Sequence, residues 1–511
     1  MYRWANCTLC NIASSLKGAS MIQNSRWRTS LIGLLCVISL WGPSIILPVQ
    51  AATDSRAMHV LNRLSLGPSP GDLKHVQSIG VEAYIKEQLS PQSLKQPPAL
   101  KQRLQRLNSL KLTPAGLIQR YQPRPNQRKR PANQEAQQRK ARIPLKQAEQ
   151  ARLMQAVASP RQLEEVMVNF WFNHFNVSIQ KGRVRFWVGD YEQKAIRPYV
   201  LGSFRDLLGA TAKHPAMLFY LDNWRNTAPN SPGARAQFKG LNENYARELL
   251  ELHTLGVDGG YTQADVIATA ELFTGWGIPN PRQLPQHPSG FYFDAKRHDN
   301  RPKSLLGQEI SGQGMAAGEK VLDVLASHPA TAKHISYKLA QYFVADQPPP
   351  ALVKRLTQRY LKTDGDIRAV LETLFESPEF WDQKYVGRKF KTPYEYVLST
   401  VRAQGGGPNF KTQQILGMLS QLGMPLYRCR TPDGYAMTQS EWLNPEAVTR
   451  RVSLATSLAR GRQPQKNAAN VDKLLETLGG QFSPETQSVV DASPQNLRTA
   501  LLLGSPDRMY R

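Results

Sequence analysis

The sequence predicts an all-α protein: one large multi-helix body with at most a small β-hairpin near residues 290–310. Two observations predict this fold. Apolar residues recur at helical spacing in segment after segment, and capping residues, Pro and Gly separate these segments. The helical pattern weakens only around 290–310, where GFYFD and SLLGQEI favour a hairpin. The 511 residues are 41% hydrophobic and 20% charged, which suits a folded protein and excludes a wholly disordered one.

The N-terminus has the pattern of a secretory signal peptide. Two arginines precede an apolar run over 31–47, and small residues occupy the −3 and −1 positions of a cleavage site after Ala51. We therefore expect residues 1–51 to be removed, with Met21 as a more natural start, and the mature protein to be periplasmic or extracellular. An uncleaved membrane anchor is the alternative. No second long apolar run follows, so we expect no membrane span after cleavage.

The charge of the chain points to anionic partners. The net charge is +26, and removal of residues 1–51 would leave 61 basic against 39 acidic residues. Such a balance favours nucleic acid, anionic lipid or an acidic polymer without distinguishing among them. The same cleavage would remove three of the four cysteines and leave Cys429 alone, so no intramolecular disulfide is expected.

Four segments follow the signal peptide. Residues 52–118 form an N-terminal helical segment, 147–461 the main helical body, and 462–511 a polar tail with weaker helices. The segment 119–146 is rich in Gln, Arg, Lys and Pro and predicts a disordered, solvated basic insertion. Polyanion binding by this insertion is the alternative interpretation. Its most basic point is Arg128, Lys129 and Arg130.

The stretch GLNENYARELLELHTLGVDGGYTQADVIATAELFTGWG, residues 240–277, reads as two capped helices around a glycine turn. Asn242 is the expected N-cap of the first helix, and Thr262 with Asp265 forms a capping box for the second. At 100° per residue, one arc of the first helix collects its charged and polar side chains. They are Glu243, Asn244, Arg247, Glu248 and Glu251.

Two interpretations of this arc remain open. It is a solvent-facing ladder of Glu–Arg pairs four residues apart, or it faces a cleft. In a cleft, three carboxylates around one arginine are suited to acid–base chemistry or to holding a cation. His253 on the apolar arc, and His174 within an apolar stripe of an earlier helix, are expected to be core histidines rather than ligands.

A polar segment downstream supplies further candidates. Asp294, His298, Asp299 and Lys303 crowd a stretch without helical periodicity, and loops commonly carry functional side chains. A turn with local hydrogen bonds is the alternative. The sequence contains no HExxH, GxSxG, Walker or Rossmann glycine pattern, so no standard reaction class is indicated and metal or cofactor use stays open.

Several blocks together resemble a bacterial family. They are FWFNHFNVS, HPAMLFYLDNWRN, NENYARELLELHTLGVDGGYTQADV, FTGWG, RHDNRPKSLLGQEI and KFKTPYEYVLSTVRA. Over residues 55–460 they are similar to the domain of unknown function 1800 family. The resemblance implies an exported, mostly helical protein, often encoded beside a sulfatase-like member of the domain of unknown function 1501 family. It brings no established reaction.

Two hypotheses about function follow. The first is an exported enzyme that acts on an envelope or extracellular polymer through a carboxylate, arginine and histidine cleft. Its catalytic candidates are Glu243, Arg247, Glu248, Glu251, His298 and Asp299. Its binding candidates, taken partly from the resemblance, are Asn173, His174, Asp222, Asn223, Lys303, Arg128, Lys129 and Arg130. The second is a non-enzymatic protein that binds an acidic polymer or assists the sulfatase-like partner.

Overall fold

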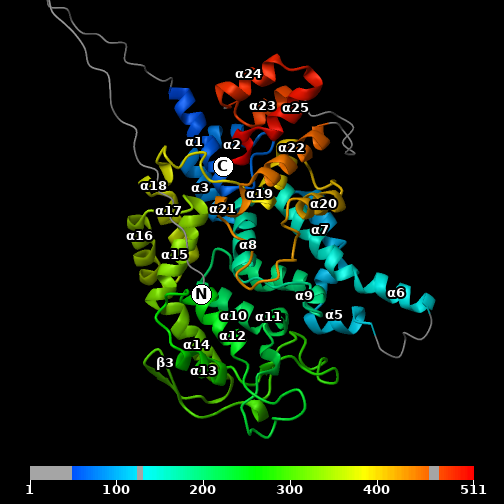
Figure 1. Cartoon of the computed structure of the whole chain (residues 1–511), viewed down its shortest axis with the longest axis vertical. Coiled ribbons are helices and arrows are strands. Elements are labelled where there is room, and N and C mark those ends of the chain that lie inside the picture. The colour runs from blue at the N-terminus through cyan, green and yellow to red at the C-terminus, as the bar shows by residue number, and fades with distance from the viewer. Residues whose placement is uncertain (1–48, 124–130, 460–470, 481) are drawn as a thin grey trace, which may run out of the picture. The chain divides into compact units, whose positions relative to one another are not determined.

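The computed structural model describes residues 49–123, 131–459, 471–480 and 482–511. Most of the predicted signal peptide, and the basic triplet Arg128, Lys129 and Arg130, lie outside these ranges. The described chain is predominantly α-helical, as the sequence predicts (Figure 1). No described helix is both long enough and apolar enough to cross a membrane.

The first half of the chain builds the centre and one flank of this body. Its helices are α1 (Val49–Leu64), α2 (Asp72–Ile79), α3 (Val81–Leu89), α4 (Pro98–Gln105), α5 (Pro114–Tyr121), α6 (Pro131–Ala141), α7 (Ile143–Ala158), α8 (Gln162–His174), α9 (Val184–Asp190), α10 (Phe204–Lys213), α11 (Pro215–Tyr220), α12 (Glu243–Glu248) and α13 (Gln263–Leu272). Two π-helical turns, Tyr191–Ile196 and Leu249–Thr254, continue α9 and α12.

The second half supplies the remaining helices. They are α14 (Gly314–Ser327), α15 (Pro329–Phe343), α16 (Pro350–Lys362), α17 (Ile367–Phe375), α18 (Pro378–Trp381), α19 (Pro393–Ala403), α20 (Thr412–Gln421), α21 (Gln439–Trp442), α22 (Pro445–Ala459), α23 (Val471–Thr477), α24 (Pro484–Ala492) and α25 (Gln495–Gly504). The weak helices expected in the tail therefore exist, and α24 is an addition to them. The tail packs firmly, since Leu502 and Leu503 are completely buried.

Helix α8 lies at the centre of the fold (Figure 1). Its side chains are buried almost without interruption, including Val166, Phe170 and Trp171 at 0% exposure. A helix that is apolar on most of its surface must be surrounded by other helices, and α3, α7 and the first π-helical turn pack against it. This central position explains why its polar side chains contact backbone groups or other buried side chains rather than solvent.

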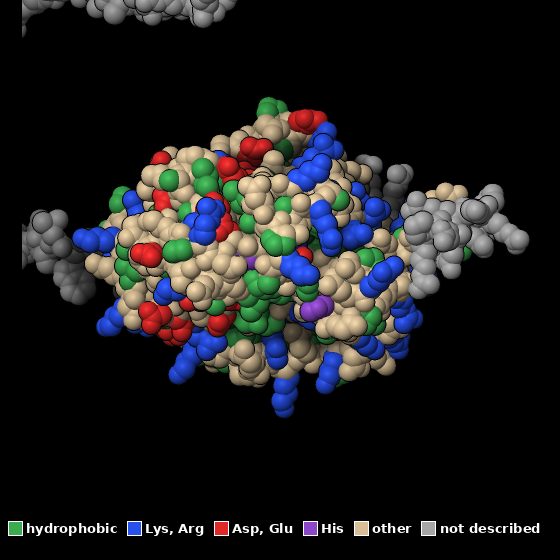
Figure 2. Space-filling model, turned by 90° about the horizontal axis from the view of Figure 1, so that it is seen from below, with side chains coloured by type: hydrophobic (Ala, Val, Ile, Leu, Met, Phe, Trp, Pro, Cys, Tyr) green, Lys and Arg blue, Asp and Glu red, His purple; other side chains and the backbone are tan. Residues whose placement is uncertain are grey.

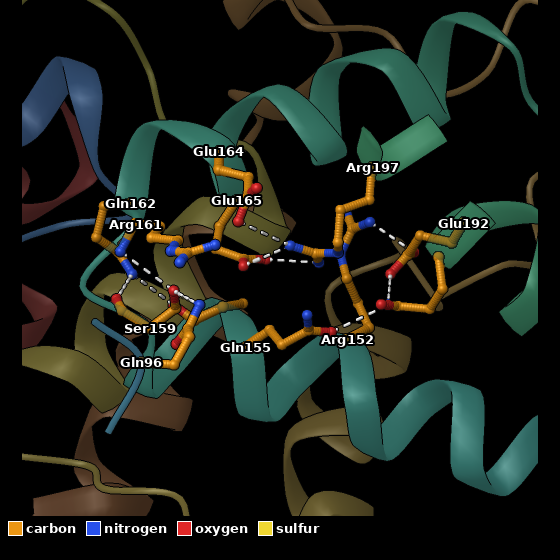
Figure 3. Close-up of polar contacts among 12 residues, drawn as sticks. Gln96, Arg152, Gln155, Ser159, Arg161, Gln162, Glu164, Glu165, Glu192 and Arg197 are labelled. Atoms are coloured by element: carbon orange, nitrogen blue, oxygen red, sulfur yellow. Dashed lines mark hydrogen bonds and ion pairs between the residues drawn. The ribbon is translucent and has the colours of Figure 1, made fainter. Parts of the chain in front are cut away.

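Buried ion pairs cross this central region (Figure 3). Arg152 of α7 contacts Glu192 at 2.6 Å, with both side chains at most 2% exposed. Arg197 holds the carboxylate of Glu165 on α8 through two hydrogen bonds of 2.7 and 2.9 Å. Buried pairs with full hydrogen bonding fix the relative register of the helices that carry them.

The expected hairpin near 290–310 differs in its pairing. Strand β2 (Tyr292–Phe293) pairs antiparallel with β1 (Trp276–Gly277), whereas β3 (Lys303–Leu305) pairs with β4 (Gln308–Ile310). SLLGQEI thus folds back on itself, because Leu306 and Gly307 both adopt positive φ and form the tight turn. GFYFD pairs instead with the FTGWG segment.

The segment 119–146 is not a continuous loop. Helix α6 covers Pro131–Ala141, and α7 starts at Ile143, where the sequence predicted a disordered insertion. The prediction weighed the low apolar content of the segment. Gln, Ala, Arg and Lys are nevertheless good helix formers, and proline stands at the start of both helices, where its missing N–H costs nothing.

Candidate functional site

The acidic arc of α12 is half exposed to solvent. Glu243 and Arg247 approach to 3.5 Å with side chains 40% and 43% exposed, and Gln263 of α13 bridges them through hydrogen bonds of 2.8 Å. Exposed pairs of this kind contribute roughly 0.3–0.5 kcal/mol. At these two residues, the solvent-facing ladder is the better description.

Glu248 occupies a different environment. Burial, Glu251 and Asp433 raise the pKa of its carboxyl group, and Arg247 opposes this shift. Glu251 accepts a hydrogen bond of 3.2 Å from the Tyr261 hydroxyl. Glu251 lies in the π-helical turn that begins at Leu249, where the winding differs from the 100° spacing assumed for an α-helix. The structure therefore groups Glu248 with an acid that the sequence did not single out, Asp433.

His298 and Asp299 hold the β-hairpin region in place. The ring nitrogens of His298 lie 2.8 Å from the carbonyl oxygens of Thr274 and Gly312. Asp299 binds Arg301, which holds its carboxyl pKa well below the usual range, and Lys303 at 3.2 Å. Among the described residues, no hydrogen bond or ion pair links His298 or Asp299 to the carboxylates of α12, so these contacts do not join the two groups into one cleft.

The binding candidates on α8 and near α11 also contact backbone. Asn173 exchanges two hydrogen bonds of 2.8 Å with the main chain of Tyr435. The completely buried Asn223 donates to the Trp276 carbonyl at 3.0 Å. Asp222 differs, because its half-exposed carboxylate meets Lys181 at 2.6 Å. These amides fix loops around the core.

His174 and His253 are core histidines, as expected, each 1% exposed. The partly buried His334 lies beside them, and the ring centroids of His253 and His334 are each 6.2 Å from that of His174. Burial and the nearby Lys338 lower the pKa of all three, to about 3 for His253 and about 4 for His334. The described residues contain no group of three or more His, Cys, Asp or Glu arranged to hold a metal ion.

A cleft of about 1190 Å³ lies between α6, α7, α9 and α20. We call it the basic cleft. Five cationic side chains line it: Arg142, Lys146, Arg183, Arg185 and Arg428. Within the described part of the chain, none of the five makes an ion pair with a carboxylate. Unpaired cations that converge on a cavity produce a local positive potential that attracts anions.

Glu149 is the one carboxylate among the lining residues. Its residue is 8% exposed, and burial raises its pKa to about 7, a shift that Arg428 partly opposes. No hydrogen bond or ion pair to Glu149 is formed within the described residues. A largely buried, unpaired carboxyl group with a perturbed pKa in a cleft is a candidate functional group. It is neutral at acidic pH and adds negative charge to the cleft above pH 7.

A smaller, more apolar groove of about 300 Å³ continues from the basic cleft. The two share Gln122, Pro123 and Arg183, and the groove adds Trp187 and Ile278. Apolar and aromatic surface beside cationic side chains suits a ligand that carries both sugar-like faces and acidic groups.

On the face seen in Figure 2, Lys and Arg side chains are widely spread, whereas Asp and Glu gather in fewer places.

Sequence reasoning missed most of the basic cleft. Arg142 and Lys146 fall in the segment judged basic, but Arg183, Arg185 and Arg428 look like ordinary surface cations. Only the packing of α20 against α7 brings position 428 to the others. One weak signal in the sequence marks Glu149 as unusual: it is an acidic residue beside alanines that face the core of the protein.

Comparison with known families places nearly the whole described chain in one of them. Residues 59–510 match the family described as protein of unknown function, DUF1800. The chain belongs to the DUF1800 family. The match continues past residue 460 into the C-terminal tail and includes the segment that forms α6. No curated protein and no solved structure matches the chain, so DUF1800 membership supplies no reaction for the basic cleft.

Proposed function

We propose that this DUF1800 protein binds an acidic polysaccharide outside the cytoplasm, and that the basic cleft is the binding site. The observation that supports the proposal is the convergence of five unpaired cations on one cleft of about 1190 Å³. A cavity of that size accommodates several sugar units, and arginine forks match carboxylate and sulfate groups. Arg183 also lies over the Phe219 ring at 5.8 Å, which leaves aromatic surface beside the charge.

The experiment compares two triple variants of equal charge change. Arg183→Gln, Arg185→Gln and Arg428→Gln together remove charge from the basic cleft. Lys320→Gln, Lys354→Gln and Lys362→Gln remove the same charge from exposed positions on α14 and α16. Binding to labelled dextran sulfate and polygalacturonate is measured by fluorescence anisotropy at several salt concentrations.

The cleft variant is expected to bind at least about tenfold more weakly, with a shallower salt dependence, because it loses specific charge pairs. The control variant is expected to stay within about twofold of wild type, the effect of net charge alone. Equal weakening by both variants would show that only overall charge matters, and the cleft proposal would be abandoned.

A second candidate function is cleavage of such a polymer by the carboxylates on α12. The observation that favours it is the grouping of Glu248 with Glu251 and Asp433, which together with burial raises the pKa of Glu248, the direction of shift that a general acid requires. Glu248→Gln and Glu251→Gln are expected to abolish the release of new sugar ends without altering the circular dichroism spectrum. Undiminished release by both variants would exclude this role.

Export and partnership complete the proposal. The signal-like N-terminus supports a periplasmic or extracellular location, and a sulfatase-like partner of the domain of unknown function 1501 family would share an acidic, sulfated substrate. N-terminal sequencing of the mature protein tests cleavage after Ala51. Co-purification with the partner, with and without dextran sulfate, tests the partnership.

A further inference from the structure

A second cavity, of about 350 Å³, lies between α1, the segment 386–388 and the C-terminal residues. We call it the C-terminal cavity. Its polar lining comprises Ser55, His59, Asn62, Arg388, Arg508 and Arg511, together with Asp507. It shares no lining residue with the basic cleft. In Figure 1 the C-terminal end of the chain lies beside the first helices, which is the contact that encloses this space.

Buried positive charge is concentrated behind the cavity. Six basic side chains are each at most 6% exposed: Arg63, Lys389, Lys391, Arg451, Arg508 and Arg511. They act on one another, since Arg508, Arg511 and Arg451 all reinforce the effect of burial and hold the pKa of Lys391 well below its usual range. Burial also lowers the pKa of Arg63 to about 9 and that of Arg508 to about 10.

The negative charges nearby are fewer. Glu395 meets Arg511 at 2.9 Å, and Asp346 pairs with Lys389. Asp507 is held by the backbone amide and hydroxyl of Ser483, at 3.2 and 3.1 Å. The six buried cations therefore outnumber these three carboxylates. Excess charge enclosed in a folded protein is costly unless a counter-charge reaches it.

Several arginine N–H groups in this region also lack a hydrogen-bond acceptor within the described part of the chain. Nε and Nη2 of Arg508, Nε of Arg511, and Nε and Nη1 of Arg63 are enclosed and have no acceptor among the described residues. An enclosed guanidinium N–H without an acceptor costs roughly 1–3 kcal/mol, or more when charged. Arg508 and Arg511 also line the cavity, so an anion bound there would lie beside the guanidinium groups that lack acceptors in the described structure.

We propose that the C-terminal cavity binds a small, doubly charged oxyanion, phosphate or sulfate, free or as a monoester. Arg508 carries two N–H groups without an acceptor among the described residues, and arginine forks bind tetrahedral oxyanions, while Arg511 adds positive charge although its Nη2 already contacts Glu395. Asn62, Ser55 and the exposed Arg388 also line the cavity and add further donors. The volume exceeds that of one oxyanion, so the cavity also has room for the alcohol portion of an ester.

The test uses the full mature protein, extensively dialysed into anion-poor buffer. Inorganic phosphate, inorganic sulfate and glucose 6-phosphate are titrated by calorimetry, and the melting temperature is recorded with each. We expect saturable binding at one site and a higher melting temperature, because a ligand that binds only the folded state stabilises it. Binding of the inorganic ions alone identifies a free oxyanion, and tighter binding of glucose 6-phosphate identifies an ester.

Variants separate this site from general charge effects. Arg508→Gln and Arg388→Gln are expected to weaken binding at least about tenfold. Asn62→Asp places a carboxylate in the cavity, so it should abolish anion binding and raise the melting temperature in anion-free buffer. Lys473→Gln removes an exposed cation from α23 and should change nothing. The proposal fails if none of the three probes binds, or if Asn62→Asp and Arg388→Gln bind them as wild type does.

Discussion

Arg197 and Glu165 form a two-pronged ion pair inside the protein, with Nη1 2.7 Å from Oε1 and Nη2 2.9 Å from Oε2. The Glu165 side chain is completely buried. Removing one partner of a buried pair leaves an uncompensated charge, so Arg197→Leu should lower the free energy of unfolding by about 3–5 kcal/mol. Arg139→Gln, which breaks the exposed pair with Glu135 on α6, should cost less than about 1 kcal/mol. Urea titration of both variants measures the two free energies of unfolding. Equal costs would show that burial does not matter here.

Gly67 and Gly71 form a matched pair for a backbone prediction. Both have a φ of +94°, but a methyl group on Gly67 would lie 2.9 Å from the Ser399 Cα, whereas one on Gly71 would meet nothing within 4 Å. Gly71→Ala should therefore cost about 1 kcal/mol for the backbone alone. Gly67→Ala adds a collision with the α19 backbone and should cost about 2–4 kcal/mol. Thermal unfolding of the two variants measures the difference.

Glu149 makes the stability of the protein depend on pH. Its folded pKa of about 7 lies above the ordinary 4.5, so the folded state binds the proton more tightly. The contribution of Glu149 to the free energy of unfolding is therefore fully present below about pH 4.5. It falls by about 3 kcal/mol as the pH rises through 7. Glu149→Gln should remove this loss and be more stable than wild type at pH 8. A variant with the unchanged pH profile of wild type would contradict the assignment.

The same group predicts pH-dependent binding of polymer in the basic cleft. Glu149 is the one carboxylate among the described residues that line the cleft, and with a pKa of about 7 it changes the charge of the cleft near neutrality. Wild type should bind dextran sulfate more tightly at pH 5.5 than at pH 8, and Glu149→Gln should bind equally at both. Anisotropy titrations at the two values test this, with Glu135→Gln on the exposed face of α6 as control.

His298 is expected to stabilise the segment between β2 and β4 rather than to react. Its ring joins two carbonyl oxygens from different segments, Thr274 and Gly312. His298→Ala should speed amide hydrogen exchange in β3 and β4 while leaving exchange in α8 unchanged. Unaltered exchange in the hairpin would indicate a role other than this clamp.

Local sequence signals predicted much of the fold. The capping box of Thr262 and Asp265 and the N-cap Asn242 are present as expected, because caps depend on residues a few positions apart. Such local signals did not predict the strand partner of Tyr292. This residue pairs with Gly277, and the chain between the two strands reverses without a strong turn signature. Helix α6 was not predicted, because its segment has few apolar residues and the helices were recognised mainly from apolar spacing.

The same distinction holds for the candidate sites: contacts within one helix were predictable, and contacts between distant segments were not. Helical spacing correctly placed Glu243 beside Arg247, four residues away. It could not place Asp433 near Glu248 or Arg428 near Glu149, because those pairs meet only through tertiary packing. The sequence also did not predict the excess of positive charge around the C-terminal cavity, because Arg63 and Arg511 lie far apart in the sequence.

The π-helical turn over Leu249–Thr254 closes with a hydrogen bond one residue longer than in an α-helix. Such a turn takes up one residue more than the α-helical ladder, so the side chains inside it take directions that 100° spacing does not predict. Two of them are His253, which is 1% exposed, and Glu251, which accepts a hydrogen bond from Tyr261. The extra residue therefore acts as a spacer that decides which chemical groups of this turn point inward, while the helix on either side can keep its own direction.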